Sequence, residues 1–387
     1  TTWQVADLAS GTYGDTNSIP GANFMELIGD TIYFDALGDY QQSTTVGREV
    51  WAYDTSNHSI WPATSNSFTG SWTGPSGAVA FINDTLYLVA SSSLNGAIQT
   101  EVYAHQPSEI APQTGGSGSS GSGSGSGSGS NSGTYNGNGT AWMVNDIHSG
   151  SSASSPNHLT AVGNTLYFQA DDGASGIELW KSDGTSSGTM MVKDIQSGGS
   201  SSSSSPDQLT AVGNTLYFKA DDGASGIELW KSDGTSSGTV MVKDIHSGSS
   251  DSSPNHLTAV GNTLYFTAND GTNGIELWKS DGTTSGTVMV KNIHSSSSSA
   301  PARLTAVGNT LYFSAYDGTN GTELWKSDGT ESGTVLVKDI QSGVGGSNPG
   351  TFGVIGNTLY FRAHDGTNGY ELWKSDGTSS GTVMVKD

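Results

Sequence analysis

The stretch Glu228-Leu229-Trp230-Lys231-Ser232-Asp233-Gly234-Thr235 occurs five times in this chain of 387 residues. Successive copies are separated by 50, 48, 47 and 48 residues, and they begin at Glu178, Glu228, Glu276, Glu323 and Glu371. Self-similarity at this period with strand-like patterning is typical of a β-propeller, in which each repeat is one blade that cannot bury its faces alone. The repeat therefore predicts an all-β chain built from blades.

One copy of the repeat, residues 209–245, divides into four short strands. We expect these strands at 209–212, 215–220, 227–232 and 239–245. Gly213-Asn214 is a two-residue hairpin signal, and Asp233-Gly234 begins a turn in which glycine adopts a positive φ. Leu229 and Trp230 place apolar groups on opposite faces of the third strand, as a sheet packed on both sides requires. Each copy therefore predicts an antiparallel blade packed between neighbouring blades.

The repeats resemble the bacterial ELWxxDGT repeat family over residues 141–387. Two divergent versions precede them: Leu27–Phe34 with Glu49-Val50-Trp51, and Phe81–Tyr87 with Glu101-Val102-Tyr103. Two divergent and five regular units predict a β-propeller of seven four-stranded blades, forming one domain over 1–387 with the divergent blades in about 1–147. The resemblance implies an extracellular repeat scaffold of large secreted and surface proteins, whose motif defines blades and is not a catalytic signature.

The fourth-strand pattern occurs once more than seven blades need. Thr2–Leu8 matches it, and so does Val383–Asp387. In a closed propeller only one of these segments occupies the outer edge of the seventh blade. The other is expected to pair with the edge of another molecule or to open the next repeat of a longer chain, unless Thr2–Leu8 is simply an irregular first strand.

The composition favours a location outside the cell. A net charge of −22, from 36 acidic and 14 basic residues, argues against nucleic acid or an anionic membrane as a partner. The chain has no cysteine, and no apolar run of about 18 residues suggests insertion into a membrane. Since a starting Met and a signal-like stretch are missing, we expect a processed secreted chain, although a fragment would look the same.

The segment from Gly115 to Gly139 is almost pure glycine and serine, so it cannot build a core. It separates Tyr103 from Trp142–Ile147, the third and fourth strands of the second blade, which predicts a flexible loop inserted within that blade. A neutral insertion is the simpler interpretation, and a carrier of O-linked glycans is the alternative. The glycosylation candidates, each with Ser or Thr two positions later, are Asn57, Asn83, Asn138 and Asn320.

Two sets of Asp residues beside glycine follow the second and third strands. Both sets favour turn chemistry, because Asp accepts hydrogen bonds from nearby amides and Gly supplies the left-handed conformation. Calcium is the alternative for the first set, although no spacing matches an EF-hand or the nonapeptide calcium repeat. The calcium candidates are Asp172, Asp222, Asp270, Asp317 and Asp365.

Histidine and tryptophan each allow a functional and a structural interpretation. His148 with His158, and His246 with His256, repeat a ten-residue spacing, but other copies replace them, so loop histidines are favoured over a metal site. The motif tryptophans, such as Trp230, lie between apolar neighbours in a strand. We therefore expect them to fill the space between blades and not to stack on sugars.

The third and fourth strands also predict an ion pair. If Ser232 opposes Thr239 across the hairpin, Glu228 faces Lys243 in a cross-strand pair that recurs in every regular blade. Its role would be structural.

The near-identity of the regular blades argues against an enzyme. Residues 159–195 and 209–245 differ at only two positions, so an asymmetric catalytic set would have to come from the first two blades. Those blades supply Asp35, Asp39, Glu49 and His58 without a recognisable motif. We predict no catalytic residue and no cofactor apart from the calcium alternative.

The function predicted from these features is a non-catalytic bead of a surface layer, sheath, filament or appendage. Its expected partners are copies of itself, through strand exchange, or other surface proteins. The alternative is a lectin-like adhesion module that binds glycans or other ligands at several equivalent weak sites.

Overall fold

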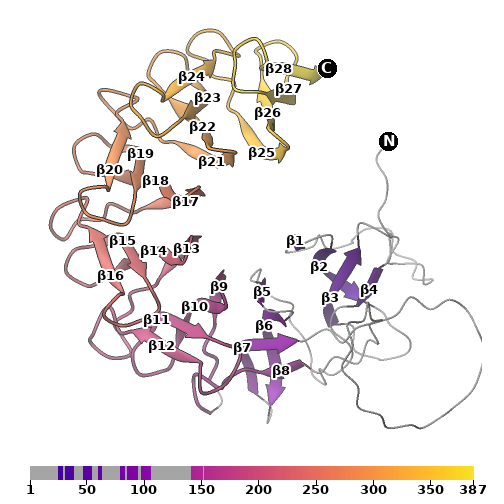
Figure 1. The fold of residues 1–387 in the computed structure, drawn as a ribbon, viewed down its shortest axis with the longest axis vertical. Helices are drawn as coiled ribbons and strands as arrows, with labels where there is room; N and C mark the ends of the chain where they lie inside the picture. The colour runs from indigo at the N-terminus through magenta and orange to yellow at the C-terminus, as the bar shows by residue number, and fades with distance from the viewer. Residues whose placement is uncertain are drawn as a thin grey trace, which may run out of the picture. The chain divides into compact units, whose positions relative to one another are not determined.

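The computed structural model describes residues 25–28, 31–38, 47–54, 60–62, 79–82, 85–94, 97–105, 141–150 and 152–387. These residues form seven four-stranded antiparallel sheets and no helix (Figure 1). Each sheet consists of four strands that are consecutive in the sequence and pair in chain order. The predicted β-propeller with four-stranded antiparallel blades is confirmed. None of the described residues belongs to a helix able to cross a membrane.

The chain divides into two compact units, and the first contains the divergent sheets. One sheet comprises β1 (Met25–Ile28), β2 (Thr31–Gly38), β3 (Gly47–Asp54) and β4 (Ile60–Pro62). The next comprises β5 (Val79–Ile82), β6 (Thr85–Leu94), β7 (Ala97–His105) and β8 (Ala141–Met143). The divergent segments are therefore built as the regular repeats are.

The regular sheets follow the same plan. The sheet of β9 (Asn157–Val162), β10 (Thr165–Asp171), β11 (Ile177–Ser182) and β12 (Met190–Lys193) has residues in both units. The second unit holds four whole sheets: β13 (Asp207–Val212), β14 (Thr215–Asp221), β15 (Ile227–Ser232), β16 (Val240–Lys243); β17 (Asn255–Val260), β18 (Thr263–Asn269), β19 (Ile275–Ser280), β20 (Val288–Lys291); β21 (Ala302–Val307), β22 (Thr310–Tyr316), β23 (Thr322–Ser327), β24 (Val335–Lys338); β25 (Gly350–Ile355), β26 (Thr358–His364), β27 (Tyr370–Ser375), β28 (Val383–Lys386).

Two bulges distinguish the observed strands from the predicted ones. In the sheet β13–β16, the register shifts between Asp207 and Thr210 in β13 and between Leu229 and Trp230 in β15. The first bulge extends β13 to a start at Asp207, two residues before the predicted start. Bulges bend a strand and redirect its side chains. Both the bulge in the first strand and the bulge in the third strand recur in the other regular sheets of the second unit.

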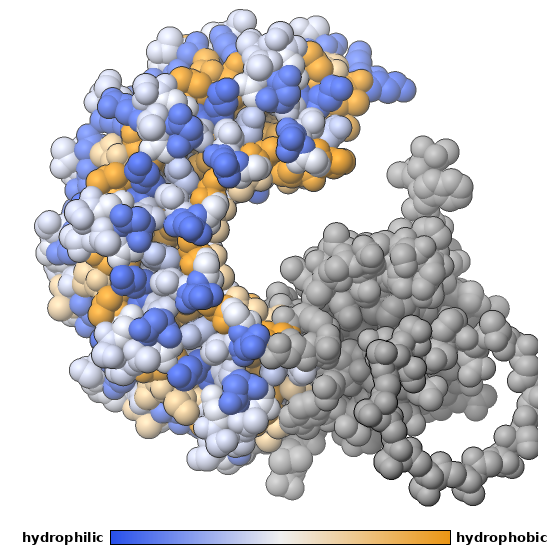
Figure 2. Space-filling view, viewed as in Figure 1, coloured by the Kyte–Doolittle hydropathy of each residue, from blue (hydrophilic) through white to orange (hydrophobic). Residues whose placement is uncertain are grey.

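The core lies between neighbouring sheets. The cluster between the sheets β13–β16 and β17–β20 joins Tyr217, Leu229 and Val242 of one sheet to Phe266 and Trp278 of the next. Within the second unit, the first strands β13, β17, β21 and β25 contact one another, and they lie on the inner side of the curve that these sheets make (Figure 1). The viewed face is mostly hydrophilic with small hydrophobic patches (Figure 2).

The C-terminal strand completes its own sheet. β28 pairs with β27 through Lys374 opposite Val383, so Val383–Lys386 occupies the edge of the last sheet. Thr2–Leu8 and the 115–139 segment lie outside the described residues. The prediction of a single domain over 1–387 stays a prediction.

Candidate functional site

A buried glutamate anchors the connection that leads from each regular sheet to the next. Glu228 is fully buried and accepts hydrogen bonds from the backbone amides of Ile245 (2.9 Å) and Ser252 (3.0 Å) and from the Ser252 hydroxyl (2.6 Å). Burial raises the pKa of Glu228, while the hydrogen bonds from Ser252 and Ile245 act in the opposite direction. The equivalent pairs are Glu101 with Ser154, Glu178 with Ser204, Glu276 with Ser299 and Glu323 with Ser347.

The predicted ion pair between Glu228 and Lys243 is wrong. The bulge between Leu229 and Trp230 shifts the register by one residue, so Lys243 lies opposite Leu229. Its Nζ donates to the carbonyl oxygen of Thr287 in the next sheet (2.9 Å) and lies 5.7 Å from the centroid of the Trp278 ring. Glu228 therefore binds backbone amides, and Lys243 binds a backbone carbonyl, without contact between the two side chains. The sequence spacing could not reveal this, because the inserted residue has no signature of its own.

Each anchored serine is followed four residues later by a residue in the left-handed region. Ser252 leads to His256, which has φ 56° and lies in the β17 bulge. The His256 amide donates to Asn255 Oδ1 (2.9 Å), and the Thr258 hydroxyl donates to the His256 carbonyl (2.9 Å). A non-glycine residue in this region costs on the order of 1–3 kcal/mol, so the surrounding contacts must hold it there. The equivalent residues are His158, Gln208, Arg303 and Thr351, with φ between 54° and 60°.

Four of these residues, Gln208, His256, Arg303 and Thr351, lie on adjacent first strands of the second unit, and we call them the inner row. The Gln208 side chain accepts a hydrogen bond from the His256 amide through Oε1 (3.1 Å), which ties one sheet to the next. Thr258 Oγ1 reaches the carbonyl of Leu304, beside Arg303, at 3.4 Å. The same backbone thus presents a different polar side chain in each sheet.

The inner row carries positive charge in an acidic protein. Burial and then the charge of Arg303 lower the pKa of His256, so its imidazole is neutral at neutral pH. Neighbouring atoms surround the His256 ring enough to disfavour its charged form, but His256 keeps an exposed surface, as does Arg303. The inner row therefore offers hydrogen-bond donors and acceptors together with a guanidinium group.

The calcium candidates lie in turns at the same end of the strands as the inner row. Asp222 accepts hydrogen bonds from the amides of Ala224 and Ser225 and from the Ser225 hydroxyl. Burial acts to raise the pKa of Asp222, but these hydrogen bonds outweigh it, so the pKa of Asp222 is lowered. Asp270, Asp317 and Asp365 make the same contacts with an Asn in place of the Ser, and Asp172 is also partnered. These contacts agree with the turn interpretation, and calcium binding stays a prediction.

The predicted histidine pairs do not share one environment. The His246 ring packs against Gly271 in the next sheet, and its Nδ1 lies 3.2 Å from the Asp251 carbonyl, whereas His256 belongs to the inner row. Across the part of the chain that the structure describes, no group of three or more His, Cys, Asp or Glu residues is placed to hold a metal ion.

The motif tryptophans pack between sheets as predicted. Trp230 and Trp278 are each 6% exposed, and Trp278 belongs to the cluster shared with the preceding sheet. They are therefore part of the core and not a sugar-stacking surface.

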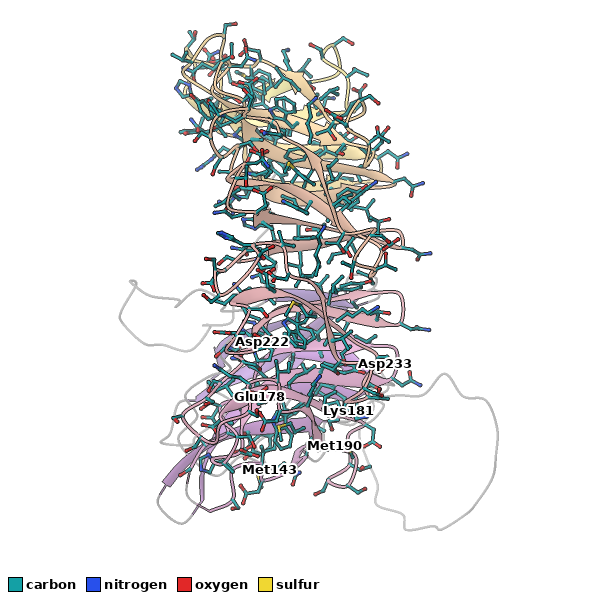
Figure 3. The ribbon with its side chains drawn as sticks, turned by 90° about the vertical axis from the view of Figure 1, so that its left-hand side faces the viewer. Met143, Glu178, Lys181, Met190, Asp222 and Asp233 are labelled. Carbon is teal, nitrogen blue, oxygen red and sulfur yellow. The ribbon has the colours of Figure 1, made fainter. Side chains whose placement is uncertain are left out.

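The Ser-Asp-Gly-Thr turn receives side chains from the preceding sheet, which the sequence did not predict. Lys231 Nζ donates to the carbonyl oxygen of Gly282 (2.8 Å), and the Tyr217 hydroxyl lies where a Cβ at Gly282 would be. This turn and the Asp-Gly loop lie at opposite ends of the third strand. Figure 3 labels one residue of each, Asp233 in the turn and Asp222 in the loop. The only sequence signal for these contacts was that a Lys and a Tyr recur at the same two positions of every regular repeat.

Other predicted residues are placed only in part. The Asn320 side-chain amide donates to Asp317 Oδ2 (2.7 Å) within a turn. Asn57, Asn83, Asn138, Asp39 and His58 lie outside the described residues, and Asp35 and Glu49 are described only as members of β2 and β3. Glycosylation and an extracellular location stay predictions.

The fold is similar to that of solved peptidases. One is a structure from a structural and mechanistic analysis of two prolyl endopeptidases, with a TM-score of 0.51 and 9% sequence identity. The match covers 94% of this chain and 49% of that chain. A puromycin hydrolase (TM-score 0.48, 12% identity) covers 95% and 54%, and the propeller domain of the trilobed protease from Pyrococcus furiosus (TM-score 0.44, 8% identity) covers 96% and 97%. The chain therefore spans about half the length of the first two. No family model and no curated protein matches this chain.

This comparison corrects the function predicted from the sequence. The prolyl endopeptidase structure that shares the fold is not a surface-layer, filament or adhesion protein, so a structural or adhesive surface protein was the wrong prediction. The physical reason is that stacked rigid blades form a module that other proteins use for other purposes, so repetition alone does not specify assembly. β28 is also already paired within its own sheet.

Proposed function

We propose that this chain is a peptide-recognising propeller that works with a peptidase, and that the inner row contacts the peptide. The observation that carries the proposal is that four adjacent sheets hold Gln208, His256, Arg303 and Thr351 in the same left-handed conformation. Strained backbone at equivalent positions, with a different side chain at each, is expected of a surface that recognises a ligand.

A peptide fits the chemistry of the inner row. An extended peptide repeats amide donors and carbonyl acceptors about every 3.3 Å. The side chains of Gln208 and Thr351 both donate and accept hydrogen bonds, neutral His256 does the same, and Arg303 donates to carbonyls or carboxylates. The mixture suits a peptide better than a purely anionic or purely apolar ligand.

The association with a peptidase is supported by the fold similarity to the prolyl endopeptidase structure, of which this chain covers 49%. In the proposal, hydrolysis belongs to a catalytic part outside these blades. The blades contribute recognition and no catalytic residue, since the regular sheets differ mainly in the inner row and otherwise repeat nearly the same side chains.

The proposal is tested by fluorescence anisotropy with labelled, unstructured ten-residue peptides of varied composition. The variant Q208A/H256A/R303A removes three members of the inner row, and V344S is the matched control, because Val344 is 82% exposed and outside the row. We expect binding to weaken at least about tenfold in the triple variant, since hydrogen bonds to charged groups contribute roughly 1.5–3 kcal/mol, and to be unchanged in V344S. Equal binding by the triple variant, or no binding by the native chain, would contradict the proposal.

A further inference from the structure

Arg303 is the one Lys or Arg residue of the sheets from β13 to β24 whose side chain contacts neither a carbonyl oxygen nor a carboxylate. In the sheets from β13 to β24, each lysine contacts a carbonyl oxygen or a carboxylate. Lys231, for example, binds the Gly282 carbonyl, and Lys219 pairs with Asp207 at 3.0 Å. Among the described residues of these sheets, the Arg303 guanidinium alone has no such partner, and it is exposed.

The backbone at Arg303 lacks the side-chain oxygen that caps the preceding members of the inner row. The Gln208 amide donates to Asp207 Oδ1 at 2.6 Å, and the His256 amide donates to Asn255 Oδ1 at 2.9 Å. The corresponding residue before Arg303 is Ala302, whose side chain has no acceptor. The backbone conformation is nevertheless the same, with φ 60° at Arg303 and 56° at His256.

An anion at this point would therefore replace the missing oxygen. One carboxylate oxygen would accept from the Arg303 amide, as Asn255 Oδ1 does from His256, and the guanidinium would supply further donors. The neighbouring charges agree with an anionic ligand: the influences on the pKa of His256 are burial and Arg303, and no carboxylate contributes.

We infer that the Arg303 guanidinium and the Arg303 backbone amide form a carboxylate-binding position within the inner row, which takes an acidic side chain or the C-terminal carboxylate of a bound peptide. This inference rests on the proposed function and names the class of peptide. The sheet β21–β24 would therefore select peptides that carry a carboxylate. In the sheets β13–β16 and β17–β20, an Asp or Asn oxygen of the chain itself already accepts from the equivalent backbone amide.

The decisive variant is A302N, which introduces the side-chain oxygen found in the sheets β13–β16 and β17–β20. It is expected to fold normally, because Asn255 occupies the same position in β17. R303A removes the guanidinium, R303K keeps the charge without the planar fork, and V344S is the control. Melting temperatures of all four confirm that the variants are folded.

Three labelled peptides of one core sequence separate the sources of the carboxylate. One has blocked ends and a glutamate, one has no acidic side chain but a free C-terminus, and one is neutral with blocked ends. We expect one of the first two to bind the native chain at least tenfold more tightly than the neutral peptide does, which identifies the source. We expect that preference to vanish in A302N and R303A and to persist in V344S.

Two results would overturn the inference. If the neutral peptide binds as tightly as both other peptides, peptide recognition stands but the carboxylate position is contradicted. The same conclusion follows if the preference for a carboxylate is unchanged in A302N and R303A. Calorimetric titration with glutarate separates the two proposals. Glutarate binding that A302N abolishes, without binding of any peptide, would support the carboxylate position and contradict peptide recognition.

Discussion

Four of the regular sheets share a framework that does not change, and each of them leads to an inner-row position that changes from sheet to sheet. The framework consists of the Glu-to-Thr motif and the serine that its glutamate anchors, and it is the same in the sheets at Glu178, Glu228, Glu276 and Glu323. The residue four positions after that serine is Gln, His, Arg or Thr. The difference teaches that the side chains that hold the backbone must be identical, because each makes a contact of fixed geometry. The side chain that is held can vary.

The largest expected effect sharpens this contrast through Glu228. In E228Q, an NH2 group replaces one of the two oxygens that accept from Ile245, Ser252 and the Ser252 hydroxyl, so a buried donor loses its acceptor. We expect the free energy of unfolding to fall by about 2–4 kcal/mol. R303A, in the inner row, should change it by less than about 0.5 kcal/mol. Urea denaturation measures both, and similar losses would break the distinction between framework and inner row.

The next effect concerns the contact between a turn and the preceding sheet. Gly282 has φ 85°, and a Cβ there would meet the Tyr217 hydroxyl, so G282A should cost about 2–3 kcal/mol from strain and overlap. Gly261 has φ 58° with open space around it, so G261A should cost only the strain, about 1–2 kcal/mol. Thermal unfolding measures both variants.

The double variant Y217F/G282A provides the control for this explanation. Removing the hydroxyl should recover part of the loss in G282A, so the two substitutions should not add. Additive losses would show that the overlap with Tyr217 is unimportant.

A smaller effect separates two adjacent serines. Ser252 is buried and its hydroxyl donates to Glu228 at 2.6 Å, whereas Ser253 is exposed with φ 46°. We expect S252A to lower the free energy of unfolding by about 1–2 kcal/mol and S253A to change it by less than about 0.5 kcal/mol. Chemical denaturation decides, and equal losses would mean that the anchor does not depend on the hydroxyl.

The smallest effect is the pH dependence of stability. Burial raises the pKa of Glu228, so its contribution to stability is fully present below its ordinary value of 4.5 and is lost as pH rises through the folded value. The Thr235 hydroxyl and amide lower the pKa of Asp233, so that contribution is present above 3.8 and is lost as pH falls through the folded value. We therefore expect the loss in E228Q to grow as pH falls from 8 toward 4.5, measured by urea denaturation. A loss independent of pH would contradict the raised pKa.

The sequence predicted the blade from local signals and failed where a single inserted residue changed the register. Ile227–Ser232 was predicted with its observed bounds, because alternation and turn residues define a third strand. Glu228 and Lys243 were paired wrongly, since the pairing assumed a regular ladder and the bulge at Leu229 moves Lys243 by one position. The inner row was not predicted as a site, although His256 was considered as a metal ligand. The separation of 47 residues between His256 and Arg303 is one repeat and places them on neighbouring blades, but nothing in the sequence indicates the bulges that give both residues a left-handed conformation.

The sequence by itself determined the blades, their number of strands and the packing role of the tryptophans, because periodicity, turn residues and repetition act over a few neighbouring residues. Only the tertiary structure decided which groups the buried glutamates and the framework lysines bind, since their partners lie in the connection to the next sheet or in that sheet itself. It also decided that His256 and Arg303 share the left-handed conformation, because the bulges at these residues have no signature in the sequence.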